Sequence, residues 1–264
     1  MKIKLSTEEC HHVLDNKSII PFFQPIYNTE NEMCTGAEIL ARLPYANNEM
    51  LMPEHFLPGM MSARSQRILT GTLLNKTLPL LKNRLLPPGF LITFNISADM
   101  IGCSWLKIAC DNFLKDSYDK VFLVIEITER EPLTMDYFTW LPYRKSLRKS
   151  GVLIALDDFG IGYSNLFLLK QTEAEYIKIP CELVSDIEHN SVSMHIVDSI
   201  IQLGNSLNFK VIAEGVETDA QYNALQSKGI VLMQGFYFSP PLCLDDFTQY
   251  IKKDKALITR RILE

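Results

Sequence analysis

The stretch VLIALDDF at residues 152–159 decides the fold class of this chain. Its first five residues are all apolar, which is typical of a strand buried on both faces of a parallel sheet. The run then ends at two adjacent aspartates, Asp157 and Asp158, so a polar edge follows the buried strand directly. We therefore expect a largely parallel sheet that carries charged groups where its strands end.

Seven further apolar runs fit strands of the same kind. The eight predicted strands cover residues 20–28, 34–41, 90–96, 121–127, 152–157, 175–179, 209–213 and 230–233. Helix-length segments separate most of them, and apolar residues recur at helical spacing over 53–86 and 182–207. This alternation favours a largely parallel sheet, and a chain of 264 residues suits a single α/β barrel. We assign residues 20–252 to the barrel, 1–19 to an N-terminal helical extension and 253–264 to a C-terminal tail.

The composition excludes several classes of function. A formal net charge of -5 provides no broad basic surface for a nucleic-acid polymer or an anionic membrane. No apolar run is long enough to span a bilayer and the first residues do not resemble a signal peptide, so we expect a soluble, cytoplasmic protein. The six cysteines show no C-x-x-C spacing and no H-E-x-x-H motif occurs, which indicates free thiols rather than a zinc site.

Single polar residues close several of the predicted strands. In a (β/α)₈ barrel the carboxyl ends of the strands meet on one face, so such residues come together although they are distant in sequence. Those that offer hard oxygen ligands, the type that Mg²⁺ and Mn²⁺ prefer, are Glu38, Asn95, Glu126, Asp157 and Asp158. Lys178 adds a cation, Glu214 a candidate base, and Gln234 a further amide at this rim.

Each of these residues also has a simpler explanation. Asp158 alone is best explained as the N-cap of a following turn, but repulsion between two adjacent aspartates favours a bound cation, and the matching strand ends support that alternative. Asn95 can be a strand exit, Lys178 a surface charge and Glu214 a turn residue. The segment 160–165 contains two glycines but lacks the third glycine of a dinucleotide fingerprint, so we interpret it as a loop whose motion gates the site.

The sequence resembles the EAL-domain cyclic di-GMP phosphodiesterases from about residue 21 to residue 242. The resemblance rests on the order and spacing of eight motifs: FQPI at 23–26, EILAR at 38–42, NIS at 95–97, EITE at 126–129, DDFG at 157–160, YIKI at 176–179, EGVET at 214–218 and QGF at 234–236. It implies a TIM-type barrel, often with its first strand antiparallel, and hydrolysis of cyclic di-GMP to linear pGpG. This reaction lowers a bacterial second messenger connected with biofilm formation and motility.

The resemblance also implies a role for each site residue. The residues of the first metal would be Glu38, Asn95, Glu126 and Asp157, and Asp158 would help to bind a second Mg²⁺ or Mn²⁺. The catalytic set would comprise Glu38, Glu129, Lys178, Glu214 and Gln234. Glu129 would organise the loop after Asp157, near the contact of a homodimer. The residues in contact with the substrate would be Gln24, Leu40, Arg42 and Phe236, although an aromatic residue at a strand exit more often serves packing.

The chain departs from the family pattern at several positions. Ile39 replaces the signature alanine, and because side chains alternate along a strand it should point away from the metal if Glu38 faces it. Pro180 stands where the family usually has aspartate, and Ile161 replaces a threonine in the glycine loop. None of these changes deletes a predicted ligand, so an active hydrolase is our interpretation. The alternative is a catalytically silent module that binds cyclic di-GMP or a protein partner.

Overall fold

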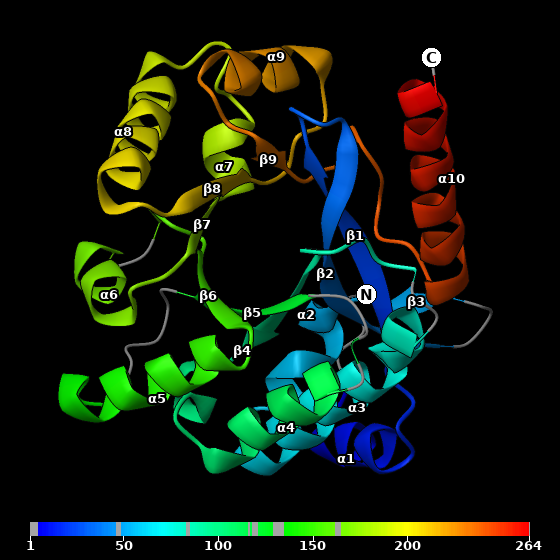
Figure 1. The fold of residues 1–264 in the computed structure, drawn as a ribbon. Helices are drawn as coiled ribbons and strands as arrows, with labels where there is room; N and C mark the ends of the chain where they lie inside the picture. Colours follow the sequence, from blue (N-terminus) through cyan, green and yellow to red (C-terminus); the bar gives the residue numbers. More distant parts are fainter. Residues whose placement is uncertain are drawn as a thin grey trace.

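The chain folds into a closed barrel of strands surrounded by helices (Figure 1). The computed structural model describes residues 5–45, 49–82, 85–115, 117, 121–128, 135–161 and 165–263, with side chains as far as residue 254. The strands are β1 (Ile20–Asn28), β2 (Met33–Pro44), β3 (Met50–Leu51), β4 (Leu91–Ile96), β5 (Phe122–Thr128), β6 (Val152–Asp157), β7 (Tyr176–Ile179), β8 (Lys210–Ala213) and β9 (Leu232–Met233). The helices are α1 (Thr7–Asp15), α2 (Pro53–Phe56), η2 (Leu57–Gly59), α3 (Ala63–Lys82), η3 (Ala98–Met100), α4 (Ser104–Lys115), α5 (Tyr137–Lys149), α6 (Asn165–Thr172), α7 (Cys181–Val184), α8 (Ser191–Leu207), α9 (Asp219–Ser227) and α10 (Leu244–Leu263).

The order of the strands confirms the TIM-type barrel. Going round the barrel the order is β1-β9-β8-β7-β6-β5-β4-β2, and a pairing between β1 and β2 closes it. Strand β1 runs antiparallel to both of its neighbours, whereas β2 and β4 to β9 pair in parallel with one another. The antiparallel first strand that the resemblance implied is therefore present.

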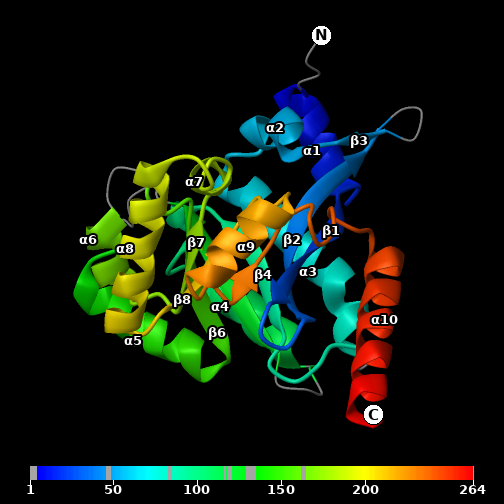
Figure 2. The same ribbon diagram turned by 90° about the horizontal axis from the view of Figure 1, so that it is seen from above.

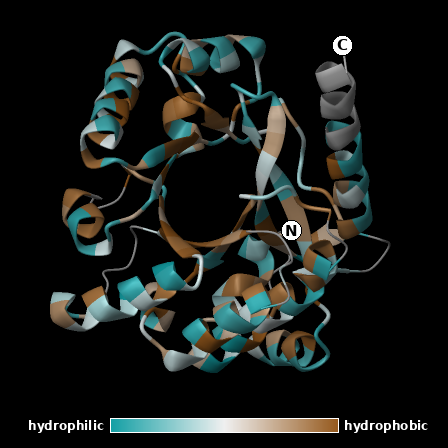
Figure 3. Cartoon of the chain, in the orientation of Figure 1, coloured by the Kyte–Doolittle hydropathy of each residue, from teal (hydrophilic) through white to brown (hydrophobic). Residues whose placement is uncertain are grey.

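Two apolar layers make up the core. The larger one fills the space between the strands and the surrounding helices, and the strands are accordingly coloured mostly as hydrophobic in Figure 3. The smaller one is a cluster inside the barrel whose members are Ile26, Leu91, Val124, Ala155, Tyr176, Ile212 and Leu232. Because side chains alternate between the two faces of a strand, residues two positions further along the parallel strands, and two positions earlier on the antiparallel β1, share the interior with this cluster.

The last helix, α10, packs against the β1–β2 hairpin at the edge of the barrel (Figure 2). The ring of Phe247 stacks on Phe23 with centroids 5.2 Å apart, and the Asp254 carboxylate accepts a hydrogen bond of 2.6 Å from the Cys34 amide. The helix continues beyond residue 252, where we had expected a tail. Its first half therefore belongs to the packed body of the domain.

The structure corrects the sequence prediction in three places. The segment 53–86 contains a short helix, a 3-10 turn and the long helix α3 rather than one helical stretch, and 182–207 divides into α7 and α8. The short strand β3, which extends β2 at its edge, was not predicted. All six cysteines are free, as expected. In the part of the chain described, no helix combines the length and apolar character needed to cross a membrane.

Candidate functional site

The predicted polar residues gather at the carboxyl ends of the parallel strands. Asn95 and Glu126 are register partners on β4 and β5, and Gln24 on β1 is the partner of Glu38 on β2. The remaining members close or directly follow their strands: Asp157 on β6, Lys178 on β7, Glu214 after β8 and Gln234 after β9. Apart from Glu38, each shares a strand face with a member of the interior apolar cluster, so the barrel places a polar rim above an apolar layer.

Lys178 lies at the centre of this rim. Its ammonium nitrogen Nζ is 2.6 Å from Oε1 of Glu214, 3.0 Å from Oε2 of Glu126, 3.2 Å from Oε2 of Glu38 and 3.3 Å from Oδ1 of Asp157. The lysine side chain is only 1% exposed. Strand alternation explains this position, because Ile177 and Ile179 point into the outer core while Lys178 points into the barrel.

Amide side chains hold Glu38 in place. Asn95 Nδ2 donates a hydrogen bond of 2.9 Å to Glu38 Oε1, and Gln234 Nε2 donates one of 2.8 Å to Oε2. The same Gln234 nitrogen lies 3.1 Å from Gln24 Oε1. Ile39 is buried in the outer core, as expected from its alternation with Glu38. The replacement of the family's alanine therefore leaves the rim intact.

The proximity of these charges shifts their pKa values in opposite directions. Burial alone would lower the pKa of Lys178, but the surrounding carboxylates outweigh it and raise the pKa well above its usual value. Burial, followed by the charge of Glu38, raises the pKa of Glu126 well above normal. Burial also opposes ionisation of Glu38, but Lys178 and three hydrogen bonds turn the net shift of its pKa downward.

Glu214 has a pKa suited to proton transfer near neutral pH. Burial raises the pKa of this carboxyl group to about 8, with Lys178 opposing the shift and Asp157 adding to it. Its side chain keeps 19% of its surface exposed, so a water molecule can reach it. A carboxylate with such a pKa can accept a proton and release it again at physiological pH.

The donor set fits a hard divalent cation. Oxygens of Asp157, Asp158 and Glu214 lie within 4.8 Å of one another, close enough to share a metal ion. Oε1 of Glu126 is buried and has no hydrogen-bond partner among the described residues, and the same is true of Oε1 of Gln234. A buried carboxylate oxygen without a partner is costly unless a cation is bound, and oxygen ligands of this kind are those that Mg²⁺ and Mn²⁺ select.

The segment after β6 adopts the backbone conformation of a tight turn. Asp158 has a φ of 55°, and the Ile161 amide donates a hydrogen bond of 3.3 Å to its carbonyl oxygen. This turn directs the carboxylate toward Asp157 and Glu214, whereas an N-cap residue has an extended backbone. Glu129 and the loop residues 162–164 lie outside the described residues, so the roles predicted for them remain predictions.

The residues predicted to contact substrate differ in their surroundings. Phe236 is 63% exposed, whereas its neighbour Tyr237 stacks on Tyr222 with ring centroids 5.2 Å apart. The packing explanation therefore fits Tyr237 and leaves Phe236 available at the rim. Arg42 is buried, with its guanidinium 5.8 Å from the ring centroid of Phe22 and a hydrogen bond to the Ala41 carbonyl oxygen. Leu40, between Glu38 and Arg42 on the same face of β2, is half-buried.

Sequence reasoning missed the requirement for glycine at position 235. A Cβ atom added to Gly235 would lie 2.0 Å from the carbonyl oxygen of Val216, which no real structure tolerates. The close approach is held by hydrogen bonds from the Val216 amide to the Gln234 carbonyl and from the Tyr237 amide to the Val216 carbonyl. Gly235 thus lets the loop that carries Gln234 pack on the loop that carries Glu214. The signal was available in the QGF motif.

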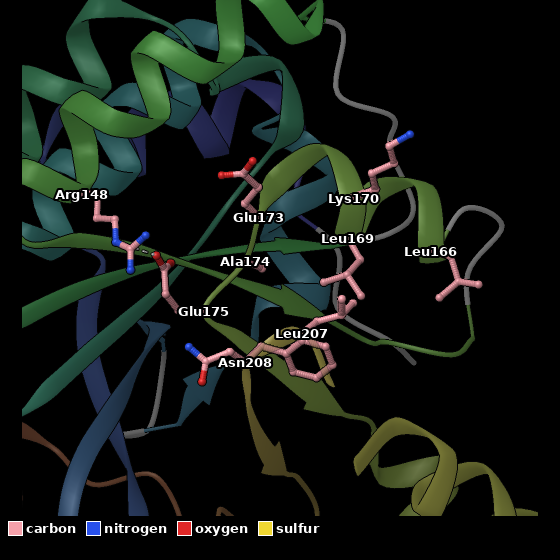
Figure 4. A pocket seen from close by; sticks show the side chains of 10 residues that line it. Arg148, Leu166, Leu169, Lys170, Glu173, Ala174, Glu175, Leu207 and Asn208 are labelled. Carbon is pink, nitrogen blue, oxygen red and sulfur yellow. Dashed lines mark ion pairs between the residues drawn. The ribbon is translucent and has the colours of Figure 1, made fainter. Parts of the chain in front are cut away.

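A cavity of 440 Å³ lies at the amino ends of β7 and β8, opposite the rim (Figure 4). One of its two acidic residues, Glu175, pairs with Arg144 and with Arg148 at 3.5 Å, and it accepts a hydrogen bond of 2.9 Å from the Ile154 amide. These contacts tie α5 to the bottom of the sheet. Glu175 and Arg148 of this cavity are therefore engaged in holding the fold together.

The fold and the rim together define a TIM-type barrel with a buried acidic site at the carboxyl ends of its strands. The family model described as EAL domain matches residues 7–241, and the chain therefore belongs to this family. Within the barrel the family resemblance found in the sequence is confirmed.

Two curated relatives come from Escherichia coli. The chain is 34% identical over 250 residues to the probable cyclic di-GMP phosphodiesterase PdeG, covering 92% of this chain and 48% of PdeG. It is 32% identical over 232 residues to the cyclic di-GMP phosphodiesterase PdeL, covering 87% of this chain and 64% of PdeL. The chain thus spans only part of the length of each relative.

A solved structure of the PaMucR phosphodiesterase in complex with c-di-GMP is also similar. The two structures superpose with a TM-score of 0.79 at 27% sequence identity. The match covers 90% of this chain and 99% of the other, so it extends round the whole barrel.

Proposed function

We propose that this chain is a phosphodiesterase that hydrolyses cyclic di-GMP to linear pGpG with the help of Mg²⁺ or Mn²⁺. The observation that carries the proposal is the convergence of Glu38, Glu126, Asp157 and Glu214 on one buried rim. The names of PdeG and PdeL, and the ligand bound to PaMucR, support the substrate. Hydrolysis of an intracellular messenger would place the protein in the bacterial cytoplasm.

The residues of this chain divide the work between binding and proton transfer. Glu38, Asn95, Glu126 and Asp157 would hold one cation, and Asp158 would hold a second together with Asp157 and Glu214. Bound cations of this kind lower the pKa of a water molecule and neutralise charge on the attacking and leaving oxygens. Gln234 fixes the orientation of Glu38 through its hydrogen bond of 2.8 Å.

Proton transfer falls to Glu214 in this proposal. Its carboxylate, with a pKa of about 8, accepts a proton from the attacking water as the new bond to phosphorus forms. The phosphorus–O3′ bond would break as the new bond forms, O3′ would take a proton from solvent water, and Glu214 would afterwards release its own proton to solvent. The product keeps a 5′-phosphate. Lys178 supplies positive charge beside the phosphate oxygens as their charge increases.

The substrate would be held at the outer part of the rim. Phe236 offers an exposed ring on which a guanine base can stack, and Gln24 and Leu40 line the same end of the β1–β2 hairpin. Arg42 would need to turn away from Phe22 to reach a phosphate. Substitution of Phe236 by leucine should therefore raise KM more than it lowers kcat.

The test is a turnover assay with purified protein and cyclic di-GMP, in the presence of Mg²⁺ and then of Mn²⁺. We expect pGpG as the product, detected by chromatography and mass spectrometry. If folded protein bound the nucleotide tightly but released no pGpG with either metal, the catalytically silent binding module would replace this proposal.

A homodimer is also part of the proposal. Leu166 and Phe167 on α6 are 67% and 70% exposed, and Phe138 on α5 is 86% exposed. Exposed apolar groups of this size favour a protein interface. Sedimentation of the native protein and of a Phe167→Ser variant would test it, with dissociation expected only in the variant.

A further inference from the structure

The surroundings of Lys178 contain more negative charge than one ammonium can balance. Its nitrogen contacts four carboxylates within 3.3 Å, whereas an ammonium group has only three N–H donors. The side chain is 1% exposed and Glu126 is fully buried, so water contributes little screening. In this structure Lys178 therefore acts as the cation around which the carboxylates are arranged.

The oxygens that surround Lys178 are also those that a metal ion would require. Both oxygens of Glu38 are already occupied, since Oε1 accepts from Asn95 and Oε2 accepts from Gln234 and Lys178. Oε2 of Glu126 and Oδ1 of Asp157 face the same ammonium. Oε1 of Glu126 remains open to a divalent cation, and a cation bound there would lie beside the ammonium group. Repulsion between the two positive charges would then weaken the contacts of Lys178 with the shared oxygens.

We propose that Lys178 is an internal counter-ion of the rim and that a divalent cation binds by exchange with its ammonium group. The inference rests on the metal site of the proposed function and adds a second task for this residue. Lys178 positions the carboxylates and holds the fold together in the absence of metal, and it lowers the affinity of the site for metal. It is thus a positioning residue in addition to any contact with substrate.

Simple electrostatics gives the direction of both effects. Removal of the ammonium leaves four carboxylates close together with no cation, which destabilises the metal-free protein. The same removal increases the attraction for a divalent cation and frees oxygens for its coordination. Metal affinity and metal-free stability should therefore change in opposite directions when the lysine is neutralised.

The experiment compares Lys178→Met with Lys210→Met, a matched control in which the substituted lysine is exposed at the start of β8. Binding of Mn²⁺ without nucleotide is followed by the electron paramagnetic resonance signal of the free ion. We expect Lys178→Met to bind Mn²⁺ more than about tenfold more tightly than the native protein, and Lys210→Met to bind it equally. The thermal unfolding temperature without metal should fall only in Lys178→Met.

A double variant, Lys178→Met with Glu126→Gln, covers the case in which the single variant does not fold without metal. It replaces one of the four carboxyl groups by a neutral amide and returns the formal charge of the rim to its native value, so its metal-free unfolding temperature should recover. Equal or weaker Mn²⁺ binding by folded Lys178→Met would overturn the inference, as would a double variant no more stable than the single one. If no protein bound Mn²⁺, both this inference and the metal site would fall, whereas binding without hydrolysis would overturn only the proposed reaction.

Discussion

Val124 and Glu126 lie on the same face of β5, and Ile212 and Glu214 have the same relation along β8. An apolar layer and a charged layer inside the same barrel are therefore only two residues apart along a strand. The apolar layer, here called the lower layer, stabilises the fold because it removes apolar surface from water. The charged layer, here called the upper layer, brings carboxylates close together and lowers the stability of the fold. Such a loss is common where residues are arranged for function. The two layers should respond in opposite ways to substitution.

The largest expected effect concerns turnover in the upper layer. Glu38→Ala should reduce kcat by about 10³-fold or more, because a lost metal ligand removes several kcal/mol of stabilisation from the transition state. The thermal unfolding temperature should change little, since repulsion with Glu126 is relieved at the same time. A control, Glu8→Ala on the exposed face of α1, should leave both quantities unchanged. Turnover near the native rate would remove Glu38 from the set of ligands.

The second effect concerns stability in the lower layer. Ile212→Ala should lower the free energy of unfolding by about 2 to 5 kcal/mol, since it leaves a cavity at a fully buried position. Denaturant unfolding measures this loss. The turnover of the folded fraction should remain within a few-fold of the native value. A collapse of turnover with native stability would show that the two layers are not separable.

The third effect links the layers through the metal. Addition of Mn²⁺ at about 100 times its Kd should stabilise the native protein by about 2.7 kcal/mol. Calorimetry with and without a chelator measures the shift. Ile212→Ala should keep this increment, while Glu38→Ala should lose it. An increment that survived in Glu38→Ala would place the cation elsewhere.

The smallest effect is expected at the boundary between the layers. Thr93 on β4 is fully buried, and its hydroxyl has no hydrogen-bond partner among the residues described. Thr93→Val keeps the shape and removes the unpaired group, so the free energy of unfolding should rise by about 1 kcal/mol. Unchanged kcat would assign Thr93 to the apolar layer, whereas a loss of turnover would assign it to the rim.

Sequence patterns predicted the layers better than the contacts within them. Continuous apolar runs located all eight barrel strands, because burial on both faces leaves a clear signal over residues such as 152–157. They did not reveal β3, whose two residues are too few to form a pattern. Helical spacing over 182–207 continued through the break before α8, because a short loop hardly disturbs a period of three and four residues.

For the site, the types of residue were predictable and their partners were not. The polar strand ends indicated that Glu38, Glu126 and Asp157 would meet. Nothing in their spacing showed that the nitrogen of Lys178 would lie among them, because that depends on rotamers and on the stagger of the strands. The orientation of Arg42 toward Phe22 is likewise a result of packing between neighbouring side chains.

The reversed direction of β1 has a consequence for communication within the domain. Since β1 is antiparallel to its neighbours, Ile20 lies at the same end of the barrel as the rim. The chain that leaves α1 therefore enters the barrel beside the rim, half a strand before Gln24, and Gln24 is connected to Glu38 through the hydrogen bonds of Gln234. In a barrel with every strand parallel, the amino-terminal segment would join the first strand at the far end, below the apolar layer. The antiparallel strand thus joins the amino-terminal segment to the acidic rim by a short stretch of chain.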